Sequence, residues 1–165
     1  MTAADPNWLP QAWVLIDTAY AMALGGAIGL EREMKNRPAG FRTHMLVAGA
    51  AALLVGIGQL ALHDPRFESP QRLQIDPLRL VEAVVAGVAF IGAGTIFSRR
   101  GSQTIAGITT AASLLMVAVI GIAAGFDYKL LALAATLLTL LVLTLLKAFE
   151  KRLQPPDSAA SPDTR

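Results

Sequence analysis

The stretch "GLEREMKNRPAGFRTH", residues 29–44, places a cluster of charged side chains between two apolar, glycine-rich runs. Apolar residues make up 54% of the 165-residue chain, which is too much for an ordinary soluble domain with a solvated surface. A lipid bilayer is therefore the expected surroundings of most of the chain. The charged stretch is then a loop that joins two membrane-spanning helices.

Five apolar stretches follow one another, each near the ~20 residues with which a helix crosses ~30 Å of hydrocarbon. They cover residues 12–30, 44–62, 78–97, 104–125 and 130–146. A soluble all-helical bundle is the alternative, but the last four stretches have few residues to form a polar face. The predicted fold is an all-α membrane protein, a compact bundle of five transmembrane helices.

The basic residues predict the orientation of this bundle. Of the fourteen Lys and Arg residues, ten fall on one side of the predicted membrane and four on the other. The ten are Arg32, Lys35, Arg37, Arg42, Arg99, Arg100, Lys147, Lys151, Arg152 and Arg165; the four are Arg66, Arg72, Arg79 and Lys129. Because cytoplasmic loops carry the excess of Lys and Arg, we expect the N-terminus outside and the C-terminus in the cytoplasm.

Several function classes find no support in the sequence. The chain has no cysteine, so it has neither a disulfide nor a thiolate metal site. His44 and His63 stand at opposite ends of the second span, ~28 Å apart along a helix, so they cannot share one metal ion. The net charge of +2 follows from the cytoplasmic loops and indicates lipid contact, not nucleic-acid binding. No nucleophile, base and orienting group share one level, so we expect no enzyme.

The charged loop places two acids at an unfavourable position. Pro38 and Gly40 predict that the first helix ends near Glu33 or Met34, so Glu31 and Glu33 lie at its C-terminus, where the helix dipole opposes negative charge. We therefore expect an ion-pair network, centred on Glu31, Arg32 and Arg42, at the cytoplasmic ends of the helices. A solvated loop that only enforces topology is the alternative.

Four motifs in one order carry a resemblance to a known family. They are "GGAIGLERE", the following "PAGFRTHMLVAGAAAL", then "FIGAGTIF" and "GITTAASLLMVAVIGIAAG". Together, over about residues 15–146, they resemble the membrane domain of the MgtC/SapB family. The resemblance implies a bacterial inner-membrane protein, linked in some members to growth under magnesium limitation and to survival inside hosts. The apolar stretches and the charge pattern predict a short periplasmic N-terminus at 1–11 and a transmembrane domain at 12–147, and the polar, proline-bearing end of the chain predicts a disordered cytoplasmic tail at 148–165.

The resemblance and the charge pattern together define the candidate site residues. The expected cytoplasmic charge network consists of Glu31, Arg32, Glu33, Arg42, Thr43, His44, Arg99 and Arg100. The residues expected to pack helices together are Gly25, Gly29, Gly92, Gly94, Gly107, Thr109, Thr110, Gly121 and Gly125, several of them at the small-xxx-small spacing that lets helix backbones approach closely in lipid.

Two acids, Asp17 and Glu82, fall within the predicted spans, each ~7 Å below the outer membrane boundary. Each has small residues at helical spacing on its face, so we expect both to point into the bundle and toward each other. A weakly bound Mg²⁺ between them is left open, with ordinary salt bridges, such as Glu82 with Arg79, as the alternative. The matching places of the acids also suggest two repeated hairpins plus one helix.

Two functions follow from these expectations. The first is a regulatory membrane protein in magnesium homeostasis or stress adaptation, which docks on another membrane complex. The second is a cation or proton transporter or channel that uses Asp17 and Glu82. The expected surroundings are the lipid bilayer, with a membrane-protein partner and a homo-oligomer left open and nucleic acid excluded. No cofactor is expected apart from the weakly bound Mg²⁺.

Overall fold

The structure, a computed structural model, describes residues 8–62, 64, 76–97 and 106–153. These residues form five helices, which are α1 (Trp8–Met34), α2 (Phe41–Leu62), α3 (Pro77–Phe97), α4 (Ile108–Gly125) and α5 (Lys129–Leu153). The helices α1 to α4 are long and apolar enough to cross a membrane, by length and composition, and α5 is apolar over Lys129–Leu145. The predicted all-α bundle is confirmed.

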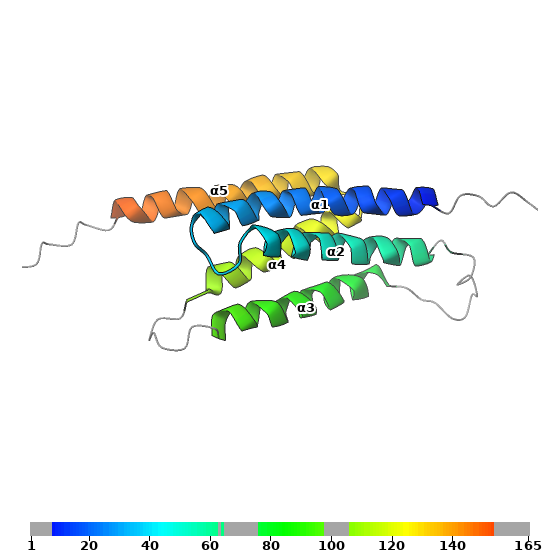
Figure 1. Ribbon diagram of the computed structural model, residues 1–165, viewed down its shortest axis with the longest axis horizontal. Helices are drawn as coiled ribbons and strands as arrows, with labels where there is room; N and C mark the ends of the chain where they lie inside the picture. The colour runs from blue at the N-terminus through cyan, green and yellow to red at the C-terminus, as the bar shows by residue number, and fades with distance from the viewer. Residues whose placement is uncertain (1–7, 63, 65–75, 98–105, 154–165) are drawn as a thin grey trace, which may run out of the picture.

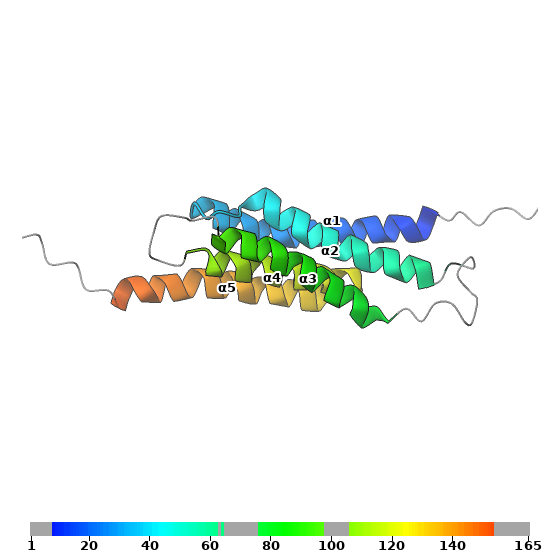
Figure 2. The same ribbon diagram turned by 90° about the horizontal axis from the view of Figure 1, so that it is seen from below.

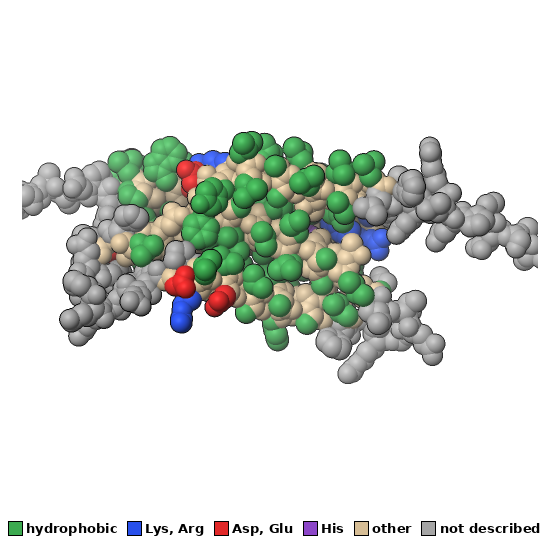
Figure 3. Space-filling model, turned by 180° about the vertical axis from the view of Figure 1, so that it is seen from behind, with side chains coloured by type: hydrophobic (Ala, Val, Ile, Leu, Met, Phe, Trp, Pro, Cys, Tyr) green, Lys and Arg blue, Asp and Glu red, His purple; other side chains and the backbone are tan. Residues whose placement is uncertain are grey.

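Helix α4 lies at the centre of the bundle. It contacts all four other helices, and 56% of its span is buried, compared with 17% of the span of α3. Helices α1 and α3 lie at opposite edges in Figure 1, with α2 and α4 between them. Helix α5 packs against both α4 and α1, and Figure 2 shows it on the opposite side of the bundle from α2. Figure 3 shows hydrophobic side chains over the middle of one face and charged side chains toward its two ends.

Glycines on two helices meet the backbone of α2. A Cβ atom added to Gly25 of α1 would lie 2.6 Å from the carbonyl oxygen of His44, and one added to Gly125 of α4 would lie 2.8 Å from that of Ala52. Gly29 and Gly121 meet α2 in the same way, at Phe41 and Ala48 respectively. The small-xxx-small spacing predicts close helix contact at these four positions, and the structure confirms it. Helix α2 packs closely against both α1 and α4.

The other residues expected to pack helices divide into two groups. Gly92 approaches Ala111 of α4, Thr110 is buried, and Gly107 begins α4 in a left-handed conformation with φ +102°, which favours glycine. Gly94 and Thr109 are exposed instead, and a Cβ added to Gly94 would meet no atom within 4 Å. The packing role expected for Gly94 is therefore wrong within the described chain, because its side of α3 meets no neighbouring helix, whereas Thr109 lines a groove between α4 and α5 and its packing role stays a prediction.

The predicted domain boundaries need two corrections. Helix α1 already begins at Trp8, within the segment expected as a terminal extension. Helix α5 continues to Leu153, so residues 148–153 are helical and not a disordered tail, whereas residues 154–165 lie outside the described chain. The α1–α2 and α3–α4 hairpins are both present, and their origin as a repeat stays a prediction.

The α1–α2 turn, the start of α4 and the C-terminal end of α5 share one end of the bundle (Figure 1). We call this end the turn end. It holds Arg32, Lys35, Arg37 and Arg42 of the basic group expected on one side of the membrane. Lys129 begins α5 at the opposite end, as the division of basic residues requires.

We expect Gly25→Ala to destabilise the bundle by about 1–3 kcal/mol, because the added methyl group would press on the backbone of α2. Gly87→Ala is the matched control, since nothing lies within 4 Å of its added Cβ and alanine favours helix by about 1 kcal/mol. Thermal unfolding of the purified protein in detergent measures both. Equal melting temperatures for the two variants would contradict the close α1–α2 contact.

Candidate functional site at the turn end

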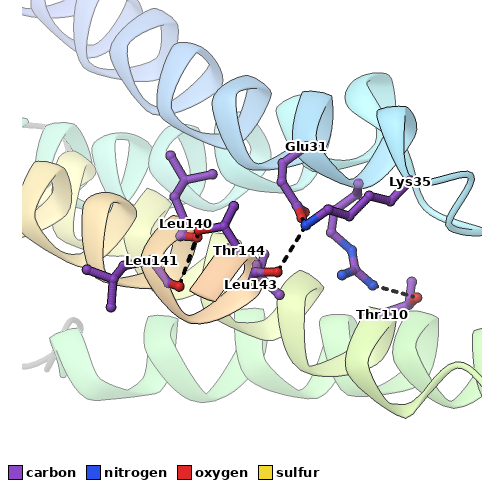
Figure 4. Close-up of polar contacts among 8 residues, drawn as sticks. Glu31, Lys35, Thr110, Leu140, Leu141, Leu143 and Thr144 are labelled. Atoms are coloured by element: carbon purple, nitrogen blue, oxygen red, sulfur yellow. Dashed lines mark hydrogen bonds and ion pairs between the residues drawn. The ribbon is translucent and has the colours of Figure 1, made fainter. Parts of the chain in front are cut away.

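Lys35 joins the end of α1 to α5 and pairs with a buried acid. Glu31 and Lys35 lie one helical turn apart and form an ion pair, and the Lys35 Nζ also donates to the Leu143 carbonyl of α5 at 3.1 Å (Figure 4). The Glu31 side chain is only 10% exposed. Glu31 lies at the C-terminus of α1, where the helix dipole disfavours a negative charge. The positive charge of Lys35 offsets this effect.

Arg32 is the most deeply buried charged side chain in the described chain, at 3% exposure. Its guanidinium donates to the Thr110 hydroxyl of α4 over 3.5 Å (Figure 4). The Arg32 Nε and the Glu31 Oε2 are buried without a hydrogen-bond partner among the described residues. An unsatisfied donor and an unsatisfied acceptor of opposite charge thus lie on neighbouring residues, which is costly in an apolar interior.

Glu33 stabilises the start of the next helix. Its Oε2 accepts a hydrogen bond of 2.7 Å from the Phe41 backbone N–H, at the N-terminus of α2. The dipole of α1 disfavours the negative charge of Glu33 at the C-terminus of that helix, whereas the dipole of α2 favours the same charge at its N-terminus. The turn itself is closed by backbone bonds, such as Arg37 N–H to the Arg32 carbonyl at 3.0 Å, and Asn36 takes the left-handed conformation with φ 51°. The α1–α2 turn is therefore fixed at both of its ends.

His44 links α2 to α4 inside the bundle. It is fully buried, with Nδ1 2.9 Å from the Gly40 carbonyl and Nε2 3.1 Å from the Ser113 hydroxyl. Because a carbonyl only accepts, Nδ1 carries the proton, and Nε2 of a neutral ring is an acceptor. The Ser113 hydroxyl then has two acceptors for one hydrogen, the His44 Nε2 and the Thr110 carbonyl at 2.8 Å.

The structure gathers most of the predicted charge network at the turn end, but with other partners. Glu31, Arg32, Glu33 and His44 each bind a different group, and none of these is Arg42. Arg42 is exposed, so the predicted coupling of Glu31, Arg32 and Arg42 is wrong. The reason is helical geometry, because Arg42 lies about 200° around α2 from the buried His44. Thr43 is half-buried, and Arg99 and Arg100 lie outside the described residues.

Lys35 and Ser113 are the site residues that sequence reasoning missed. The i, i+4 spacing of Glu31 and Lys35 could have identified the first. Ser113 gives no local signal, because its contact joins residues 69 positions apart.

The two intramembrane acids do not converge. Asp17 pairs with Lys129 Nζ at 3.0 Å, at the start of α5, while Glu82 is exposed on α3. Since α1 and α3 lie at opposite edges of the bundle in Figure 1, the expectation that the acids face each other is wrong, and they form no common Mg²⁺ site within this chain. Among the described residues, no group of three or more His, Asp or Glu side chains could hold a metal ion.

We expect Ser113→Ala to destabilise the bundle by about 1–3 kcal/mol, because it leaves the buried His44 Nε2 without a partner. Thr144→Ala should have little effect, since Thr144 is exposed and its hydroxyl bonds only to carbonyls of its own helix (Figure 4). Thermal unfolding in detergent compares the two. A destabilisation no larger for Ser113→Ala than for Thr144→Ala would show that the His44–Ser113 contact contributes nothing.

The chain is similar to several bacterial proteins. The MgtC family model matches residues 19–152. Protein SapB of Bacillus subtilis (strain 168) is 33% identical over 150 residues, which are 90% of this chain and 63% of SapB. The putative magnesium transporter YhiD of Escherichia coli (strain K12) is 41% identical over 118 residues, and Protein MgtC of Brucella abortus (strain 2308) is 35% identical over 140 residues.

The YhiD alignment covers 72% of this chain and 53% of YhiD, and the MgtC alignment covers 85% of this chain and 54% of MgtC. The chain therefore spans about half to two thirds of the length of these three relatives. No solved structure matches it. The order of the apolar helices and the extent of the family match lead to one conclusion: the chain is a membrane protein that belongs to the MgtC family.

Proposed function

We propose that this protein is a non-enzymatic regulator that acts in bacterial magnesium homeostasis or stress adaptation by docking on another membrane complex. The family and the name of the YhiD relative, a putative magnesium transporter, support the connection with magnesium. The docking element that the structure supports best is the α1–α2 turn.

The observation that carries this proposal is that the turn is both exposed and rigid. Met34 is 77% exposed, and Arg37, Arg42 and Phe41 are exposed beside it. Glu33 and the backbone bonds of the turn fix this surface from inside. A surface that is already ordered loses little conformational entropy on binding, and its two arginines suit an acidic patch on a partner.

A cation transporter is the second candidate, favoured by the name of the YhiD relative, a putative magnesium transporter. The geometry supports it less. Asp17 already pairs with Lys129, which also pairs with Asp127, and the interior beside Asp17 is filled by close contacts between helices α1, α2 and α4. A path that uses both Asp17 and Glu82 would have to cross this packed centre or run between copies of the chain.

We further propose that the turn end faces the cytoplasm of a bacterium and that the protein lies in the inner membrane. The excess of basic residues at this end supports that orientation. Because the chain has no cysteine, a single cysteine reports its side of the membrane without background. We expect Asn36→Cys to react with an impermeant maleimide only from the cytoplasmic side and Tyr128→Cys only from outside; the reverse pattern would invert the topology.

The docking proposal predicts that the double variant Arg37→Glu, Arg42→Glu loses growth rescue in magnesium-limited medium, in a strain that lacks the protein. Its level in the membrane and its melting temperature should be unchanged, because both side chains are exposed. The control is Arg37→Lys, Arg42→Lys, which keeps the charge and should rescue growth.

The same purified proteins, reconstituted in liposomes, separate regulation from transport. We expect no Mg²⁺ flux from the wild-type protein. Flux that survives the double Glu variant and disappears with Asp17→Asn would establish the transporter and overturn the docking proposal.

A further inference from the structure

Arg32 is a buried cation that forms no ion pair with the described residues. The neighbouring acid, Glu31, projects about 100° away from it around α1 and pairs with Lys35. The Arg32 Nε is buried without a hydrogen-bond partner among the described residues, and the bond from its guanidinium to the Thr110 hydroxyl is 3.5 Å long. Because a buried charge is stable only when it is paired, Arg32 requires a counter-ion.

The Arg32 side chain is directed at the first turn of α4, where backbone donors also lack partners within the helix. Helix α4 begins at Ile108, and Gly107 before it supplies no side-chain cap. The first bond within the helix runs from the Ala111 N–H to the Gly107 carbonyl, so the N–H groups of residues 108–110 precede the helical ladder. Ile108 is 57% exposed, so a ligand can reach this end. A helix N-terminus beside a guanidinium attracts an anion.

A phosphate group suits this set of donors. Its oxygens can accept from backbone N–H groups and from a guanidinium at the same time, and charge-assisted bonds of this kind are strong. The bond from Arg32 to Thr110 is at the outer limit for a hydrogen bond, so the guanidinium can turn toward a ligand at little cost. The single negative charge of a phosphodiester also balances the single charge of Arg32.

An apolar groove begins at the same level of the membrane as this helix end. It has a volume of about 240 Å³ and lies between α4 and α5. Thr109 and Leu143 line it on the side of the turn end, since α4 begins and α5 ends there, and Met116 and Leu138 line it closer to the middle of the bundle. A phospholipid matches both features, because it carries a phosphate at the membrane surface and apolar chains below it.

We propose that the turn end binds a membrane phospholipid, whose phosphate lies at the N-terminus of α4 against Arg32. One acyl chain of this lipid lies in the groove between α4 and α5. The phosphate supplies the counter-charge of Arg32, which comes from α1, so the lipid connects three helices and stabilises the folded bundle. This site is separate from the docking surface, which lies on the exposed side of the α1–α2 turn.

Thermal unfolding of the delipidated full chain in detergent, with and without added phosphatidylglycerol, tests the phosphate site, and native mass spectrometry counts the bound lipid. We expect the lipid to bind and to raise the melting temperature of the wild-type protein. Arg32→Met should bind it at least about tenfold more weakly, because it loses a charge-assisted hydrogen bond. Arg79→Met, the same substitution at an exposed position of α3, should bind as the wild type does. Equal binding by the two variants would overturn the proposal.

The stability of the lipid-free protein separates this role from a purely structural one. Arg32→Met removes a buried charge that has no counter-ion, so without lipid it should melt at the wild-type temperature or above it. An arginine already paired within the chain would instead be needed for stability. A lower melting temperature of lipid-free Arg32→Met, or its failure to fold, would therefore contradict the lipid site.

Two further probes identify the source of the phosphate. Diacylglycerol has the acyl chains without the phosphate, and inorganic phosphate lacks the chains, so neither should stabilise the wild-type protein. Ala112→Leu narrows the groove and should weaken phosphatidylglycerol binding by about tenfold. Ala89→Leu is the matched control at an exposed position of α3 and should have no effect. Stabilisation by inorganic phosphate alone, or equal binding by the two leucine variants, would exclude the phospholipid.

Discussion

The close approach of α1 and α4 to the backbone of α2 is the contact on which the rest of the structure depends. Ala48 of α2 lies against Gly25 on one side and Gly121 on the other. Only glycine permits such an approach, and in lipid the resulting dispersion contacts replace the hydrophobic effect as the force between helices. This spacing allows Arg32 to reach Thr110 and His44 to reach Ser113 across the turn end.

The polar groups at the turn end fix the backbone of the exposed α1–α2 turn. The two acids find local partners, since Lys35 pairs with Glu31 and Glu33 caps the following helix. Two buried polar atoms at the turn end, the Arg32 Nε and the Glu31 Oε2, have no hydrogen-bond partner among the described residues. The Glu33 contact and the backbone bonds fix the α1–α2 turn, which carries the exposed Arg37 and Arg42.

The two membrane acids show how differently equivalent sequence positions are used. Asp17 lies in the tightly packed part of the bundle and pairs with Lys129 of α5. Glu82 is exposed on α3, the least buried of the four candidate membrane spans. The rule that a charge in a membrane span needs a polar partner is met for Asp17 by Lys129, whereas Glu82 has no ion-pair partner among the described residues.

The sequence by itself determined the class of fold, the positions of the five helices and the division of basic residues between two ends, because each of these follows from local length, apolarity and charge. It also indicated the end of α1 near Met34, which the structure confirms. The partners of the charges could not be predicted. Ser113 contacts His44 from 69 residues away, and Arg42 is exposed although it lies next to the site in the sequence.

Only the tertiary structure decided which face of each helix is covered. The small residues beside Asp17 and those beside Glu82 have similar spacing, yet Gly25 is packed against α2 while Ala86 is exposed. Helical periodicity shows that residues share a face, whereas burial depends on the order in which helices surround α4. That order is set by long-range packing, for which a single helix carries no signal.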